Sequence, residues 1–141
     1  MDGTRRSRHT VEAAARLARD TRADLTVTCA YGEVSAQDRA LIARWLGRDA
    51  YSVSPAAAAD ELVHAAAACA RGQGVGRIVE RSMRGAPEET LLMIAADTRA
   101  DLIVVGDRDF SSRWDRIFRS FSTEIARRSR TDVLIINSAD R

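Results

Sequence analysis

A hexapeptide that occurs twice constrains the fold of this chain more than any other feature. Asp-Thr-Arg-Ala-Asp-Leu stands at residues 20–25 and again, letter for letter, at residues 97–102. Each copy follows a segment in which apolar residues recur every three or four positions, and each leads into a short apolar run. The chain therefore predicts repeated helix-to-strand units, as in an α/β fold.

Four short segments predict strands, three from their apolar and β-branched residues and one, residues 77–82, from its alternating pattern. They are residues 25–31 (Leu-Thr-Val-Thr-Cys-Ala-Tyr), 77–82, 102–105 (Leu-Ile-Val-Val) and 133–136 (Val-Leu-Ile-Ile). The last two runs are apolar throughout, which is typical of strands buried on both faces. We expect an open, mainly parallel, twisted sheet with helices on both faces.

Helical spacing and capping residues predict helices between these strands. The predicted helices cover residues 8–22, residues 55–72, a segment that begins at Pro87, and residues 113–128. Ser54 offers an N-cap before Pro55, and Gly74 follows the end of that helix. Residues 32–53 show no clear helix or strand pattern.

Length and charge indicate one domain, residues 1–141, without a strong electrostatic partner. The chain has 22 basic and 20 acidic residues and a formal net charge of +2, so no global field attracts nucleic acid or a membrane surface. Every basic residue is arginine, which excludes a lysine Schiff base and a P-loop lysine. Arg127, Arg128 and Arg130 lie at the carboxyl end of a predicted helix, where basic side chains interact favourably with the helix dipole and usually face water. We expect no nucleic-acid partner.

The cysteines and the amino terminus indicate a cytoplasmic protein. Cys29 lies in an apolar run and Cys69 on a predicted helix, which favours free, packed thiols over a disulfide. The amino-terminal arginines are not followed by a signal-type apolar segment, because Glu12 and Arg16 interrupt it. No run is long enough to span a membrane, and we expect no membrane partner.

The loop after residues 102–105 is the first candidate binding site, because ligands of open parallel sheets bind beyond the carboxyl ends of the strands. It reads Gly-Asp-Arg-Asp-Phe-Ser-Ser from Gly106 onward. A glycine before a helix amino terminus lets a phosphate approach unpaired N–H groups.

This region resembles the universal stress protein family. ATP-binding members carry Gly-x-x-Gly after the penultimate strand and, after a fixed spacer, Gly-Ser or Gly-Thr. Gly106 matches the first glycine and Ser120 the hydroxyl, and the final two predicted strands also look like those of the family. The resemblance implies an adenine nucleotide alpha hydrolase-like sheet and a homodimer formed through the last strand, which contains Val133, Leu134, Ile135 and Ile136.

The candidate nucleotide site departs from the family at two glycines. Asp109 and Arg119 stand where the family has the second and third glycine, so a carboxylate and a long side chain face the expected triphosphate. Arginines of the segment can compensate as bidentate phosphate donors. The implied ligand is ATP, AMP or cyclic AMP. The residues assigned to it are Asp2, Gly106, Arg108, Asp109, Arg119, Ser120 and Ser122.

The first strand of the family has no counterpart here, because the family's Val-Asp-Gly-Ser corresponds to Met1-Asp2-Gly3-Thr4 at the very start of this chain. In the family's sheet that strand is central, and its loss leaves buried main-chain groups unpaired. Three explanations stay open: a true start upstream of Met1, a partner segment in the gap, or direct pairing of the strands on either side.

We expect a non-catalytic, regulatory universal stress-type protein that does not bind ATP in the family's usual way. One alternative is an adenine-nucleotide-binding stress protein. A second alternative is a nucleotide hydrolase with a metal held by Asp107 or Asp109. His9 and His64 lie outside the loop, and no nucleophile–base pair is visible, which disfavours catalysis. A third is a structural subunit whose loop binds nothing.

Overall fold

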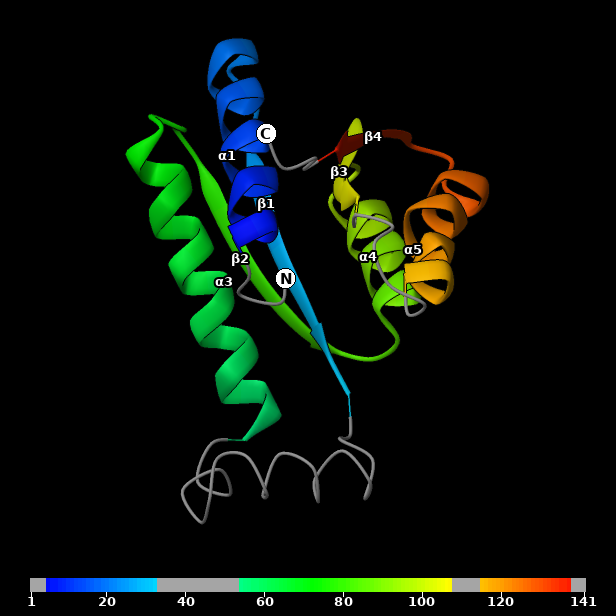
Figure 1. Ribbon diagram of the computed structural model, residues 1–141. Helices are drawn as coiled ribbons and strands as arrows, with labels where there is room; N and C mark the ends of the chain where they lie inside the picture. Colours follow the sequence, from blue (N-terminus) through cyan, green and yellow to red (C-terminus); the bar gives the residue numbers. More distant parts are fainter. Residues whose placement is uncertain (1–4, 33–53, 108–114, 138–141) are drawn as a thin grey trace.

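The fold alternates helices and short strands in the order that the sequence predicts (Figure 1). The structure is a computed structural model, and it describes residues 5–32, 54–107 and 115–137. The elements are α1 (Arg5–Thr21), β1 (Leu25–Tyr31), α3 (Pro55–Gly72), β2 (Ile78–Arg84), α4 (Pro87–Asp97), β3 (Leu102–Asp107), α5 (Asp115–Arg128) and β4 (Asp132–Asn137). Each predicted helix and strand is confirmed, with ends that differ by a few residues. Residues 33–53, for which the sequence shows no clear helix or strand pattern, lie outside the described residues.

The strands pair in parallel, as predicted, but they form two sheets rather than one. β1 pairs with β2, with Leu25 opposite Ile78, and β3 pairs with β4, with Leu102 opposite Asp132. Among the described strands, β1 and β3 do not pair with each other. Direct pairing of β1 with β3, one of the three explanations, is therefore wrong for the described strands.

The repeated hexapeptide forms the same turn twice. Thr21 and Thr98 each donate a hydroxyl hydrogen bond of 2.8 Å to the carbonyl oxygen four residues earlier, which closes the end of α1 and of α4. The next residues, Arg22 and Arg99, adopt left-handed φ values of 56° and 49°. The chain reverses there and enters β1 or β3, so the repeat encodes a helix-to-strand turn.

Capping fixes the start of α3 as the sequence predicts. The Ser54 hydroxyl accepts a hydrogen bond of 3.1 Å from the N–H of Ala57, and Pro55 occupies the first turn, where no N–H is needed. After the helix, Gly74 has a φ of 88°, a conformation that favours glycine. The predicted cap and stop of this helix are confirmed.

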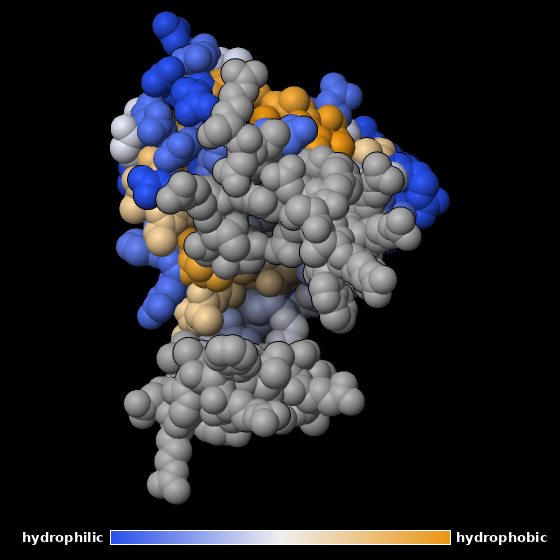
Figure 2. Space-filling view, in the orientation of Figure 1, coloured by the Kyte–Doolittle hydropathy of each residue, from blue (hydrophilic) through white to orange (hydrophobic). Residues whose placement is uncertain are grey.

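The outer strand β4 leaves apolar side chains in contact with solvent. Leu134 and Ile135 are 38% and 42% exposed, and Leu102 of the neighbouring β3 is 37% exposed. Figure 2 shows apolar surface over this part of the molecule, next to hydrophilic residues. Exposed apolar strands of this kind commonly mark contact surfaces.

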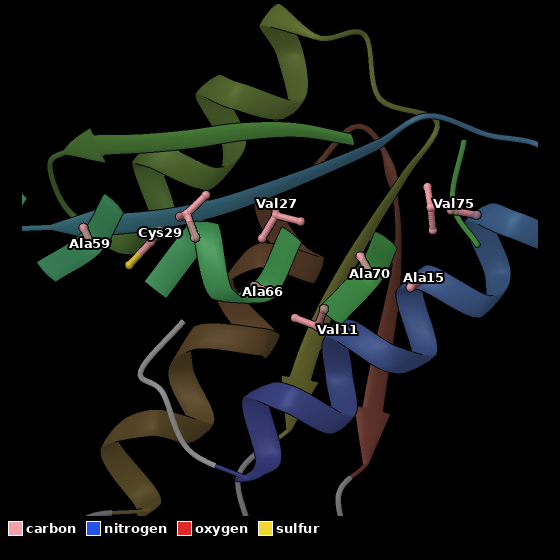
Figure 3. Packing of buried hydrophobic residues seen from close by; sticks show 10 residues of the cluster. Val11, Ala15, Val27, Cys29, Ala59, Ala66, Ala70 and Val75 are labelled. Carbon is pink, nitrogen blue, oxygen red and sulfur yellow. The ribbon is translucent and has the colours of Figure 1, made fainter. Parts of the chain in front are cut away.

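The buried side chains form two separate hydrophobic clusters, one for each sheet. The first cluster joins α1, β1 and α3 (Figure 3) and consists of Val11, Ala15, Ala18, Val27, Cys29, Ala59, Val63, Ala66, Ala70 and Val75. The second cluster joins α4, β3 and α5 and consists of Ala95, Ile103, Val105 and Ile125. Cys29 is buried and both cysteines are free, as predicted. The split core follows the split sheet.

Candidate functional site

Gly106 lies at the carboxyl end of β3, where the sequence predicts the nucleotide loop to begin. A Cβ built on this residue would stand 2.5 Å from the Thr10 hydroxyl oxygen of α1 and 3.5 Å from the Thr10 Cβ. The first helix therefore lies against the end of β3, and only a residue without a side chain fits between them. Packing requires this glycine, in addition to any role in phosphate approach.

Ser122 of α5 also contacts Gly106, from a different helix than Thr10. Its side chain is buried, and its hydroxyl donates a hydrogen bond of 3.3 Å to the carbonyl oxygen of Gly106. This contact ties α5 to the end of β3. Of the predicted site residues, the structure brings together Gly106 and Ser122. Their contact with a ligand stays a prediction.

The other predicted site residues are not part of this described centre. Asp2, Arg108 and Asp109 lie outside the described residues. Arg119 and Ser120 belong to α5, but their side chains lie outside the described part of the structure. Their assignment to the nucleotide rests on the sequence.

Sequence reasoning did not identify Thr10 as a neighbour of the loop. Thr10 lies in the second turn of α1, and Gly106 follows near the other end of the chain. No motif joins the two residues, since the contact exists only after α1 packs against β3 as well as β1. Thr10 is therefore a close neighbour of Gly106 at the candidate site.

A hollow of about 490 Å³ lies between α3 and β2. Its polar lining consists of Asp60, Glu61, His64, Glu80 and Ser82. Ser82 donates its hydroxyl to Asp60, whereas His64 Nδ1 lies 3.2 Å from Glu80 Oε2. In this hollow the serine hydroxyl and the imidazole thus have different partners, and a Ser–His catalytic pair is not assembled.

Glu80 is held in its charged form in this hollow. Its Oε1 lies 2.6 Å from Arg71 Nη2, and this hydrogen bond is the main reason that the pKa of Glu80 is lowered; His64 adds to the effect. His64 itself is 73% exposed in its side chain. His64 therefore lies at the protein surface beside Glu80.

The basic residues at the end of α5 are paired rather than gathered into a free patch. Arg127 Nη2 lies 2.7 Å from Glu124 Oε1, and Arg128 Nε lies 3.8 Å from the same oxygen. The hydrogen bond from Arg127 lowers the pKa of Glu124 and raises that of Arg127. Both arginines are exposed, as expected of side chains that face water.

The described part of the chain contains neither a cluster of metal-ligating side chains nor a helix that could span a membrane. Within residues 5–32, 54–107 and 115–137, no group of three or more His, Cys, Asp or Glu side chains is placed to hold a metal ion. No helix in the described part of the chain is long and apolar enough to cross a bilayer.

Comparison with known proteins gives consistent matches over nearly the whole chain. The model of the universal stress protein family matches residues 1–137. Universal stress protein Rv1636 of Mycobacterium tuberculosis strain H37Rv is 32% identical over 97% of this chain and 92% of its own length. Universal stress protein MT1672 of Mycobacterium tuberculosis strain CDC 1551 matches with the same identity and coverage.

Solved structures give the same result. A universal stress protein in complex with cAMP is 33% identical, with a TM-score of 0.73 over 99% of this chain and 94% of that chain. A universal stress protein from Archaeoglobus fulgidus in complex with dAMP is 17% identical, with a TM-score of 0.64 over 96% of this chain and 91% of that chain, which supports the fold alone.

Proposed function

Since this chain belongs to the universal stress protein family, we propose that it is a non-catalytic, homodimeric protein that binds an adenine nucleotide with a single phosphate, AMP or cyclic AMP, in preference to ATP. The observation that carries the proposal is the 33% identical universal stress protein that was solved with cAMP. We place the ligand at the carboxyl end of β3, where Gly106 lies beside Thr10 and Ser122, because ligands of parallel sheets bind beyond the carboxyl ends of the strands.

The altered loop sequence favours one phosphate over three. Asp109 replaces a family glycine, and a carboxylate beside a phosphate costs about 1 kcal/mol in water and about 4 kcal/mol in a partly dry site, for unit charges about 4 Å apart. Each further phosphate adds negative charge to this repulsion. A single phosphate that is held by Arg108 or Arg119 as a bidentate donor avoids most of it.

The dimer is assigned to β4. This strand pairs with β3 on one edge, and no other described strand pairs with it. Leu134 and Ile135 are exposed on it, so association would remove apolar surface and an open strand edge from water at once. The proposal places the two-fold contact along Val133, Leu134, Ile135 and Ile136.

Calorimetric titration with cyclic AMP, AMP and ATP, with and without magnesium, tests this function. We expect micromolar binding of cyclic AMP or AMP, ATP binding at least about tenfold weaker, which is a difference of about 1.4 kcal/mol, and no hydrolysis. ATP binding as tight as that of cyclic AMP, release of phosphate from ATP, or no binding of any nucleotide by folded protein would contradict the proposal.

Two loop variants separate charge from shape. Asp109→Asn removes the carboxylate and is expected to bring the affinity for ATP closer to that for cyclic AMP. Asp109→Gly removes the whole side chain and is expected to strengthen ATP binding further, whereas Arg119 stays in place as a phosphate donor. Glu61→Gln is the matched control, since it removes one charge in the hollow between α3 and β2. Equal effects of Asp109→Asn and Glu61→Gln would refute a local role for the aspartate.

A further inference from the structure

A smaller hollow, of about 310 Å³, lies at the amino ends of β1 and β2, beside the ends of α1 and α3. Its lining comes from the last residues of α1, the turn into β1 and the turn into β2. None of these lining residues belongs to the candidate nucleotide site at Gly106. We call this the arginine hollow after the three basic residues of its lining, Arg19, Arg22 and Arg77.

The charged side chains that line the arginine hollow are these three arginines and one aspartate, Asp24. A guanidinium group presents a fork of N–H donors that matches the oxygens of carboxylate and phosphate groups. All three arginines are exposed, so a dissolved ligand can reach their N–H groups. The lining therefore favours a negatively charged ligand.

Two aspartates pair with two of the three arginines. Arg77 Nη1 lies 3.1 Å from Asp24 Oδ2, and Arg19 Nε lies 2.8 Å from Asp20 Oδ1. Both pairs are exposed, and such pairs contribute little stability. Arg22 forms no ion pair with any residue that the structure describes. One arginine of the hollow is therefore not neutralised by a neighbouring carboxylate.

The Arg19 side chain is held in place by the turn that follows α3. Its Nη1 donates a hydrogen bond of 3.3 Å to the carbonyl oxygen of Gln73. A Cβ built on Gly74 would stand 3.4 Å from Arg19 Cδ, so the apolar stem of the arginine lies against this glycine. A side chain that is already positioned loses less conformational entropy when a ligand binds.

The turn into β2 leaves its main chain accessible from the hollow. Val75 is buried in the first hydrophobic cluster together with Ala18, and Figure 3 shows it beside the last turns of α1. Gly74 and Gly76, on either side of this valine, line the hollow. A Cβ built on Gly76 would meet no atom within 4 Å. The buried valine therefore fixes the turn, and the glycines let an anion approach the backbone.

The second copy of the repeated hexapeptide offers a comparison within the same chain. Arg22 and Arg99 stand at the same position of the two copies, with left-handed φ values of 56° and 49°. Arg19 directly precedes the first copy, whereas Ala96 directly precedes the second. Arg99 does not line the arginine hollow. The turn by itself therefore does not gather arginines, and Arg99 serves as a reference for Arg22.

We propose that the arginine hollow binds a single phosphate group in its doubly charged form. Arg22 would supply the positive charge that has no partner. The N–H groups of Arg19 and Arg77 that are not used in their ion pairs would donate to other phosphate oxygens. A phosphate dianion has more charge and more acceptor oxygens than a carboxylate, so it can use all three guanidinium groups. This proposal does not rest on the nucleotide function proposed above.

Titration with inorganic phosphate, followed by the amide signals in NMR spectra, tests the site. Sodium chloride keeps the ionic strength constant, so that the shifts report phosphate and not general screening. We expect saturable shifts at Ala23, Gly74 and Gly76 with a Kd on the order of 1 mM, and at least about fivefold weaker binding of acetate. Shifts at Gly106 alone would assign phosphate to the candidate nucleotide site and would overturn the proposal. Acetate binding as tight as that of phosphate, or no saturable shift, would overturn it too.

Two variants change the charge of the hollow in opposite directions. Arg22→Gln removes the unpaired guanidinium group and is expected to weaken phosphate binding by at least about fivefold, whereas Asp24→Asn removes a carboxylate and should strengthen it by about threefold. Arg99→Gln is the matched control, because it removes the same group from the same turn of the second hexapeptide, and its effect should stay below about twofold. Equal losses in Arg22→Gln and Arg99→Gln, or weaker binding by Asp24→Asn, would contradict the proposal.

Gly76→Leu tests the position of the ligand without a change of charge. The backbone of Gly76 is not in the left-handed region and open space surrounds its Cβ position, so we expect this variant to fold as the parent does by circular dichroism. The leucine side chain would fill part of the hollow and should weaken phosphate binding by at least about fivefold. Unchanged binding by the folded variant would refute the site. If the variant does not fold, the charge variants decide.

Discussion

Gly106→Ala isolates the packing role of the candidate site. The new Cβ would stand 2.5 Å from the Thr10 hydroxyl oxygen, whereas ordinary contacts begin near 3.4 Å, so α1, β3 or the Thr10 side chain must shift by almost 1 Å. Overpacking of this kind costs about 1–3 kcal/mol. The alanine restricts the unfolded chain and returns about 0.4–1 kcal/mol. We expect a net loss of about 1–2 kcal/mol in the free energy of unfolding.

A double-mutant cycle shows whether Thr10 is the cause. With Thr10→Ala in place, the closest remaining Thr10 atom is its Cβ at 3.5 Å, an ordinary contact. Gly106→Ala should then cost about 1–2 kcal/mol less than in the parent protein, well above the error expected of independent sites. Urea unfolding followed by circular dichroism measures all four proteins.

Gly76→Ala is the matched control. No atom lies within 4 Å of a Cβ built on Gly76, and its backbone is not in the left-handed region, so the change should be neutral or stabilise by up to about 1 kcal/mol. Gly106→Ala as stable as the parent, or exact additivity with Thr10→Ala, would refute the close approach of α1 to β3.

Three further predictions concern the two turns, the Ser122 hydrogen bond and the pH dependence of stability. Arg22→Gly and Arg99→Gly should each stabilise the protein by about 0.5–1 kcal/mol in thermal unfolding, because both arginines have left-handed φ values; a loss at both would contradict this account. Ser122→Ala should cost about 1 kcal/mol in urea unfolding through loss of its hydrogen bond, and no change would refute that bond. Because the pKa of Glu80 is lowered in the folded state, its contribution to stability is present at neutral pH and is lost as pH falls through and below the ordinary glutamate range; Glu80→Gln should flatten this part of the stability curve, and an unchanged slope would count against the ion pair.

The candidate site was only partly predictable from the sequence. The sequence predicts Gly106 at the carboxyl end of β3, and the structure confirms this position, because strand patterns and parallel topology together define that end of the sheet. The contacts that shape it were not predictable. Thr10 and Ser122 approach Gly106 from two helices, and no periodic pattern or motif encodes which helix turn meets which strand end.

The sequence by itself determined the elements of this protein, because their signals are local. The β1 strand matches its predicted range, Ser54 caps α3, and the two hexapeptides form the same turn, since each depends on hydrogen bonds and backbone angles within a few residues. The tertiary structure decided how these elements assemble. The division of the described strands into two sheets, the two hydrophobic clusters and the position of α1 against Gly106 depend on long-range packing of segments from opposite ends of the chain.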